Sequence, residues 1–127
     1  MSKNRKENLL LGVYKYLKSK DFENFLSVVE ELKTPEKVVE EQTGDVYIPD
    51  LTATHNGALC LFDLLTEKLS EGKQDMFIQR WDVLNKHAQS IDGKYYIIIS
   101  VDQFDQLMTL INKHNLENIG ILQFGSN

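Results

Sequence analysis

The chain has 127 residues, a length that fits a single domain with its own hydrophobic core. With 42% hydrophobic and 26% charged residues, its composition is that of a globular protein and excludes a largely disordered chain. The formal net charge of -5 argues against broad, sequence-independent adhesion to nucleic acid, because such adhesion needs a cationic surface. We therefore expect one folded domain over residues 1–127.

Cysteine usage and the distribution of apolar residues predict a cytoplasmic protein. The single cysteine, Cys60, is flanked by Leu59 and Leu61, which is typical of a buried, unreactive thiol in a reducing compartment. Residues 9–13 form an apolar run behind basic residues, as in a signal peptide, but Lys15 interrupts the pattern early. No apolar run approaches the length that spans a membrane, so we expect no membrane partner.

The first third of the chain is predicted to be helical. Apolar residues recur at helical spacing from about Asn4 to Lys18, which predicts a first helix. Asp21 is placed to cap a second helix, whose apolar stripe continues until Thr34-Pro35 ends it. The members of that stripe are Phe22, Phe25, Leu26, Val29 and Leu32.

A β-hairpin is predicted in the middle of the chain. Residues 37–41 and 46–54 are rich in β-branched residues and are expected to be extended. Asn56-Gly57 is the strongest hairpin signal, because both central residues of a type I′ turn need positive φ. The partner strand is expected from residue 58 to about residue 66.

The remaining residues alternate between helix and strand. Apolar residues at helical spacing predict an amphipathic helix after residues 70–72, ending near Asp92-Gly93. A buried strand over residues 95–101, a helix capped by Asp102 and a last strand over residues 119–124 follow. The predicted order is α-α-β-β-β-α-β-α-β, an α/β fold with a mixed sheet flanked by helices.

The hairpin has a consequence for two acidic residues. A two-residue turn at Asn56-Gly57 pairs Asp50 directly with Asp63, with Cβ atoms about 5 Å apart. Like charges so placed repel each other and need compensation. Protonation of one carboxyl, a nearby cation or a shared divalent metal would each provide it.

Pro49-Asp50 and Asp63-Leu64-Leu65, on adjacent strands, resemble the two halves of the PD-(D/E)xK motif. The chain thus resembles the superfamily of restriction endonucleases and Holliday-junction resolvases. The resemblance extends over roughly residues 4–101 and includes the amphipathic helix with Arg80-Trp81. It implies a restriction endonuclease-like core and a metal-dependent nuclease that hydrolyses DNA phosphodiester bonds.

The resemblance also implies roles for individual residues. Asp50 and Asp63 would bind Mg²⁺ or Mn²⁺ and take part in catalysis together with a lysine. Leu65 stands where the motif has that lysine, so the lysine would have to come from another element. Lys73 is the preferred replacement, because it lies one helical turn before the sheet-facing Phe77.

Other assignments stay open. Lys68 is the second candidate for the lysine, and Glu7 for a further acid from the first helix. Leu65 and the acidic balance of the chain favour an alternative function, a non-catalytic binding or regulatory module on the same fold. Asp50 and Asp63 could also be a structural pair held by a lysine or by backbone amides. DNA and a second copy of the chain are the candidate partners.

Overall fold

The structure, a computed structural model, describes residues 5–28 and 32–124. The helices are α1 (Arg5–Ser19), α2 (Glu71–Ser90) and α3 (Phe104–Lys113), with a short 3-10 helix, η1 (Val101–Gln103). The strands are β1 (Glu23–Ser27), β2 (Val38–Val39), β3 (Val46–Tyr47), β4 (Leu51–His55), β5 (Ala58–Leu64), β6 (Lys94–Ser100) and β7 (Ile119–Phe124). No helix in these two ranges is long and apolar enough to cross a membrane.

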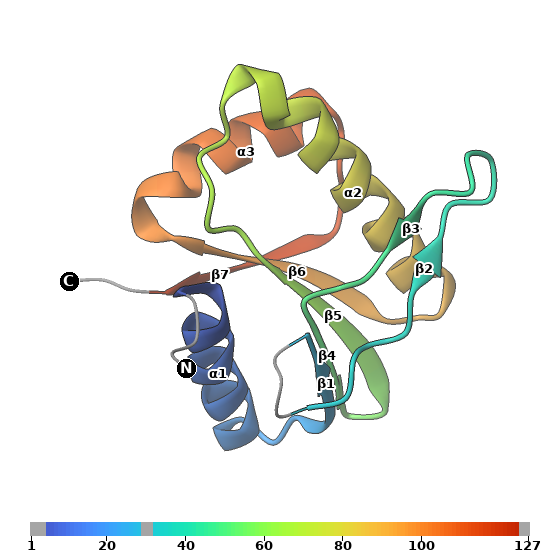
Figure 1. The fold of residues 1–127 in the computed structure, drawn as a ribbon, viewed down its shortest axis with the longest axis vertical. Coiled ribbons are helices and arrows are strands. Elements are labelled where there is room, and N and C mark those ends of the chain that lie inside the picture. The colour runs from blue at the N-terminus through green and yellow to red at the C-terminus, as the bar shows by residue number, and fades with distance from the viewer. Residues whose placement is uncertain (1–4, 29–31, 125–127) are drawn as a thin grey trace.

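A five-stranded mixed sheet in the order β1-β4-β5-β6-β7 forms the centre of the fold. β4 runs antiparallel to both β1 and β5, whereas β5, β6 and β7 are parallel to one another. Figure 1 shows α1 on one face of the sheet and α2 and α3 on the other. The predicted α/β fold with a mixed sheet flanked by helices is therefore confirmed. β2 and β3 form a separate two-stranded ribbon beside α2.

The predicted hairpin is present in the predicted register. Asn56 and Gly57 have φ of 52° and 84°, as a type I′ turn requires. Leu51 pairs with Phe62 and Thr52 with Leu61, so the next pair outward along the hairpin is Asp50 and Asp63. Local turn chemistry thus sets the register of β4 and β5.

The predicted second helix is wrong. Glu23–Ser27 forms the edge strand β1, which pairs with β4, although Val29 of the expected stripe lies outside the described residues. Asp21 and Asn24 have φ of 69° and 55°, which is incompatible with a continuous right-handed helix. The spacing of the apolar residues fits one face of a helix, but pairing with β4 overrides it. The antiparallel meander is therefore β1-β4-β5, and residues 38–39 do not join the main sheet.

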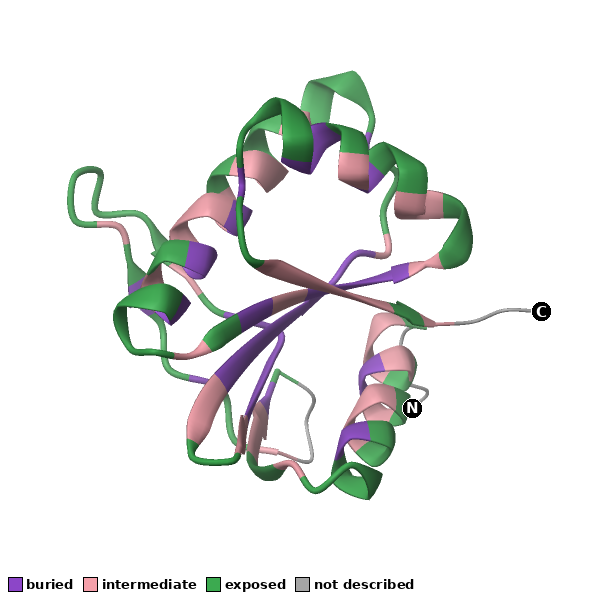
Figure 2. Ribbon diagram, turned by 180° about the vertical axis from the view of Figure 1, so that it is seen from behind, coloured by how far each residue is buried: buried purple, intermediate pink, exposed green. Residues whose placement is uncertain are grey.

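Two hydrophobic clusters fill the two faces of the sheet. The cluster under α2 and α3 includes Trp81, Leu84, Tyr95 and Leu107, all buried. The cluster under α1 includes Leu10, Leu17, Leu51 and Phe62. The central strands β5 and β6 are largely buried, whereas the edge strand β7 is only half-buried (Figure 2). The strand ends of β4 and β5, between α1 and α2, carry the two acidic residues.

Candidate functional site

Asp50 and Asp63 lie together between the two helix layers. Asp50 directly precedes β4, and Asp63 lies near the end of β5. The backbone N–H of Asp50 donates to Oδ1 of Asp63 at 3.1 Å. Both residues are buried, with exposed fractions of 6% and 4%. Two carboxyl groups in such an environment need partners that offset their charge.

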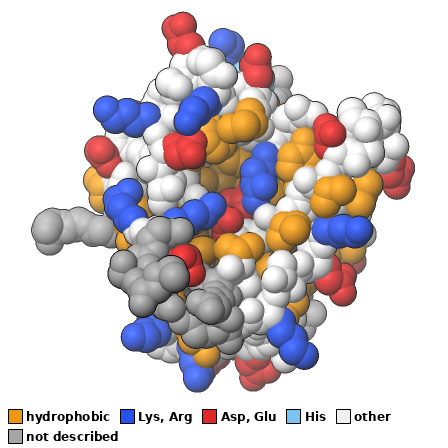
Figure 3. All heavy atoms as spheres, viewed as in Figure 1, with side chains coloured by type: hydrophobic (Ala, Val, Ile, Leu, Met, Phe, Trp, Pro, Cys, Tyr) orange, Lys and Arg blue, Asp and Glu red, His pale blue; other side chains and the backbone are white. Residues whose placement is uncertain are grey.

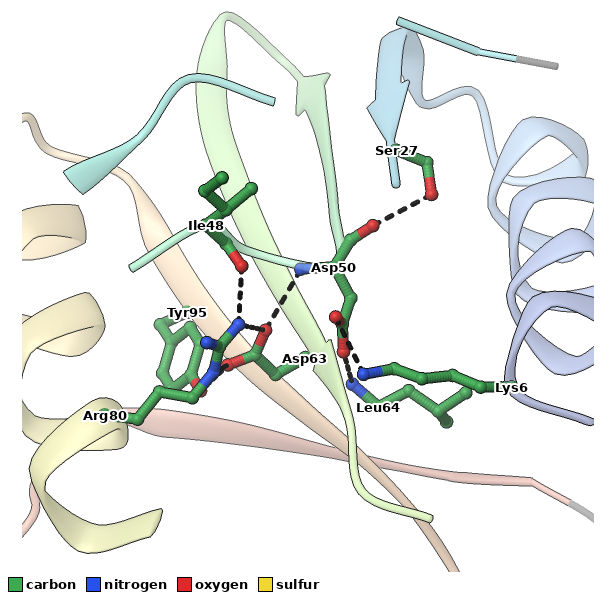
Figure 4. Close-up of polar contacts among 8 residues, drawn as sticks. All are labelled: Lys6, Ser27, Ile48, Asp50, Asp63, Leu64, Arg80 and Tyr95. Carbon is green, nitrogen blue, oxygen red and sulfur yellow. Dashed lines mark hydrogen bonds and ion pairs between the residues drawn. The ribbon is translucent and has the colours of Figure 1, made fainter. Parts of the chain in front are cut away.

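Asp63 is fully supplied with hydrogen-bond donors. Arg80, on α2, donates from Nε to Oδ2 at 2.7 Å and from Nη2 to Oδ1 at 2.8 Å. The hydroxyl of Tyr95 donates to Oδ2 at 2.7 Å, and the Asp50 N–H supplies the fourth bond. Figure 4 shows the guanidinium of Arg80 facing the Asp63 carboxylate. Each carboxylate oxygen of Asp63 therefore accepts two hydrogen bonds.

Asp50 is paired from the opposite side. Nζ of Lys6, on α1, lies 3.0 Å from Oδ1 of Asp50, and the N–H of Leu64 donates to Oδ2 at 2.8 Å. Burial raises the pKa of the Asp50 carboxyl and the charge of Asp63 adds to this, while Lys6 and the Leu64 amide oppose the rise. The backbone carbonyl of Asp50 accepts a hydrogen bond from the Ser27 hydroxyl at 2.8 Å, which ties it to β1. The carboxyl is thus held between α1 and the hairpin (Figure 4).

Arg80 also links the acid pair to the segment that leads into β4. Its Nη2 donates to the carbonyl of Ile48 at 2.6 Å. Burial alone would lower the pKa of Arg80, but its hydrogen bonds to Asp63 and the negative charge there raise it. Burial raises the pKa of the Tyr95 hydroxyl well above its usual value, and the Asp63 charge adds to the effect. Arg80 is therefore charged and the Tyr95 hydroxyl is neutral at physiological pH.

These charged groups line a cleft of about 420 Å³. Lys6, Asp50, Asp63 and Arg80 are among its charged lining residues. The apolar lining residues are Val46, Tyr47, Leu64, Leu65, Met76, Phe77, Trp81 and Ile97. Figure 3 shows a hollow in this face, where acidic and basic side chains meet between hydrophobic ones. The cleft thus combines an ion-paired interior with apolar walls.

Lys73 does not join the acid pair. Its Nζ lies 3.2 Å from Glu67 Oε2, and its side chain is 52% exposed. Lys73 does not line the cleft, and Lys68 lines a different cavity near the start of α2. Glu7 is half-buried in the first turn of α1. Of the residues expected from the motif, the structure brings together Asp50 and Asp63 alone.

Sequence reasoning missed Lys6 and Arg80 as site residues. Lys6 is one of several basic residues near the N-terminus, and nothing in its spacing distinguishes it. Arg80 lies three residues after Phe77 and next to Trp81, which places it beside the sheet-facing stripe of α2. Two facing carboxylates need a nearby cation, and this need was the signal that could have pointed to Lys6 and Arg80. It does not identify which cationic side chain lies there.

The residues present do not fit Mg²⁺ in this arrangement. Among the described residues, no group of three or more histidine, cysteine or acidic side chains could hold a metal ion. A metal on Asp63 would have to displace the two bonds from Arg80 or the bond from Tyr95. A metal on Asp50 would compete with the Lys6 ammonium. The two cations occupy the places at which a metal would contact the acids.

No family model, curated protein or solved structure matches the chain.

Proposed function

We propose that the protein is a non-catalytic binding module built on a restriction endonuclease-like fold. One observation carries the proposal: Asp63 accepts four hydrogen bonds, two of them from Arg80, so its lone pairs are already used. Lys6 offsets the charge of Asp50 in the same way. The acid pair then serves to join α1, the hairpin and α2 around a cleft.

The topology supports the fold part of the proposal. A restriction endonuclease-like core combines a leading helix, an antiparallel three-stranded meander, a crossover helix and a parallel strand. α1, the strands β1, β4 and β5, α2 and β6 occur in this order, with the β2-β3 ribbon inserted between β1 and β4. On this proposal, α3 and β7 extend the core by a second crossover unit.

The cleft supports the binding part of the proposal. Its volume of about 420 Å³ lies within the range of small-ligand pockets. Val46 and Met76, at the cleft, are 51% and 57% exposed, so both offer apolar surface to a bound molecule. Lys6 pairs with Asp50 and Arg80 with Asp63, and Glu67 pairs with Lys73 outside the cleft, so these charges offer little net attraction to an ion. The ligand class that fits best is an uncharged, largely apolar group, such as side chains of a partner protein.

Metal titration tests the non-catalytic assignment. Isothermal titration calorimetry with Mg²⁺ and with Mn²⁺ is expected to give no saturable heat with the native protein. Lys6→Ala leaves the Asp50 carboxylate without its cation, and it is the variant in which weak metal binding is expected to emerge. Saturable binding by the native protein that Asp50→Asn abolishes would overturn the proposal.

A second candidate function, DNA phosphodiester hydrolysis, is favoured by one specific contact. Lys6 brings an ammonium group to 3.0 Å from Asp50, so α1 supplies the lysine that Leu65 does not. Its test is cleavage of single- and double-stranded DNA in the presence of Mg²⁺ or Mn²⁺. Cleavage lost in both Lys6→Ala and Asp50→Asn would favour the nuclease. The net charge of -5 and the occupied Asp63 favour the binding module.

A further inference from the structure

The edge strand β7 lacks features that prevent strand pairing. Residues 119–124 contain no proline and no charged side chain. Ile119 and Ile121 are half-buried against the α2 and α3 side, and Leu122 and Phe124 against the α1 side. No strand among the described residues pairs with the outer side of β7. An uncharged apolar edge of this kind is a ready template for another strand.

The opposite edge of the sheet is built differently. β1 has an irregular register between Glu23 and Leu26, and Asn24 within it has φ of 55°. Glu23 adds an exposed charge. Bulges and charges are devices that block pairing at a sheet edge. The difference between the two edges indicates that β7 is available for pairing and β1 is not.

A groove of about 440 Å³ lies between α1 and β7. Leu9, Gly12 and Val13 line it from α1, and Leu122 and Phe124 line it from β7. Gly12 lies inside α1, although glycine is a poor helix former. A side chain at this position would meet nothing within 4 Å, so no contact inside the chain requires glycine. A glycine here keeps the groove open.

Tyr16 lies one helical turn after Gly12 and also lines the groove. It is 53% exposed, although an aromatic ring contributes most when it is covered. The exposed Tyr16 ring and the open groove beside Gly12 therefore lie next to each other on one surface. Lys20 Nζ lies 5.7 Å from the centre of the Tyr16 ring but does not line the groove, which the same surface on a second copy can fill.

We propose that two copies of the chain associate through β7, with the two β7 strands antiparallel across a two-fold axis. Such an axis is perpendicular to the sheet, so both α1 helices lie on the same face of the joined sheet. Tyr16 of each copy then covers the groove beside Gly12 of the other. Because β7 is uncharged, pairing with itself places no like charges opposite each other. The net charge of -5 on each copy opposes association as a whole, so the dimer is expected to be weak.

Sedimentation velocity over a range of protein concentrations tests the proposal. The native protein is expected to sediment as a dimer that dissociates on dilution below roughly 100 µM. Gln123→Lys places a charge on the exposed side of β7, and Gly12→Leu fills the groove with a good helix former. Each is expected to raise the dimer dissociation constant at least about tenfold. Gln42→Lys, in the exposed loop between β2 and β3, makes the same charge change away from β7 and is expected to leave the constant unchanged.

Circular dichroism of each variant verifies that the monomer stays folded. A native protein that remains monomeric up to roughly 500 µM overturns the proposal. A dimer that neither Gln123→Lys nor Gly12→Leu weakens overturns it as well, because the contact then lies elsewhere. Equal weakening by Gln42→Lys would show a general charge effect and would also contradict the β7 interface.

Discussion

Arg80 and Asp63 meet through a bidentate pair, with Nε 2.7 Å from Oδ2 and Nη2 2.8 Å from Oδ1. The pair joins α2 to β5, and the bond from Nη2 to the Ile48 carbonyl extends it to the segment before β4. Planar two-point recognition of a carboxylate is a property of arginine that lysine does not share. This contact therefore fixes both the position of α2 and the charge state inside the cleft.

Replacement of Arg80 with methionine is expected to destabilise the protein strongly. Asp63 is 4% exposed, and removal of one partner of a buried ion pair leaves an uncompensated charge. The expected loss in the free energy of unfolding is about 3 kcal/mol. Urea denaturation followed by circular dichroism measures it.

The control for this variant is Lys86→Met, which breaks an exposed pair with Asp82 on the same helix. Exposed pairs one turn apart contribute little, so a change of no more than about 0.5 kcal/mol is expected. The double variant Arg80→Met with Asp63→Leu removes both charges and is expected to recover part of the lost stability. No recovery would show that leaving the Tyr95 hydroxyl and the Asp50 N–H without their acceptor costs as much as the unpaired charge does.

Asp50→Asn is expected to change the pH dependence of stability. Burial and the charge of Asp63 raise the pKa of Asp50 above its ordinary value of 3.8. Between the ordinary and the raised pKa, the folded protein keeps a proton that the unfolded chain has released. The stability that protonated Asp50 contributes is thus fully present below the ordinary pKa of 3.8. It is lost as the pH rises through the raised pKa of the folded protein. Asparagine does not ionise and avoids this loss.

The measurement compares melting temperatures of the native protein and Asp50→Asn from about pH 3 to about pH 7. We expect the variant to gain stability relative to the native protein as pH rises. The asparagine oxygen can still accept the Leu64 amide, so the comparison isolates the charge. A difference that stays constant, or that falls with rising pH, would contradict the raised pKa of Asp50.

Tyr95→Phe removes a single donor to Asp63 and keeps the ring in the core. The hydroxyl bond to Oδ2 is 2.7 Å long and goes to a charged acceptor, so its loss is expected to cost about 2 kcal/mol. Tyr96→Phe provides the matched control, because the Tyr96 ring stacks on Phe62 and this contact is retained. Chemical denaturation of both variants is expected to show the larger loss for Tyr95→Phe. Equal losses would mean that the bond to Asp63 contributes little.

The parts of the fold that the sequence predicts well are those set by local chemistry. Asn56 and Gly57 specify a turn, the turn specifies a register, and the register places Asp50 beside Asp63 without further information. The helices α1, α2 and α3 and the strands β6 and β7 likewise follow from periodicity over short windows. Each of these features is decided by residues close together in the chain.

The parts that the sequence does not predict depend on contacts between distant segments. Glu23–Ser27 becomes a strand because β4 offers it an edge, and no periodicity within the segment contains that information. Lys6 and Arg80 lie 44 and 17 positions from their acidic partners, so only the packing of α1 and α2 against the sheet brings them together. A pair of facing acids indicates that a cation is needed. Whether that cation is a metal ion or a basic side chain depends on how the distant helices pack against the sheet.

The apolar rim of the cleft leads to a prediction about ligand binding. Indole, an uncharged aromatic probe, is expected to shift the amide signals of Tyr47 and Phe77 in ¹H–¹⁵N NMR spectra, because both residues line the cleft. Val46→Ser removes apolar surface at the cleft and is expected to weaken binding about three-fold. Val101→Ser makes the same change at a valine that is 58% exposed on η1 and should have no effect. Larger shifts with acetate than with indole would show instead that Lys6 and Arg80 bind anions, because the cleft would then prefer charge to apolar surface.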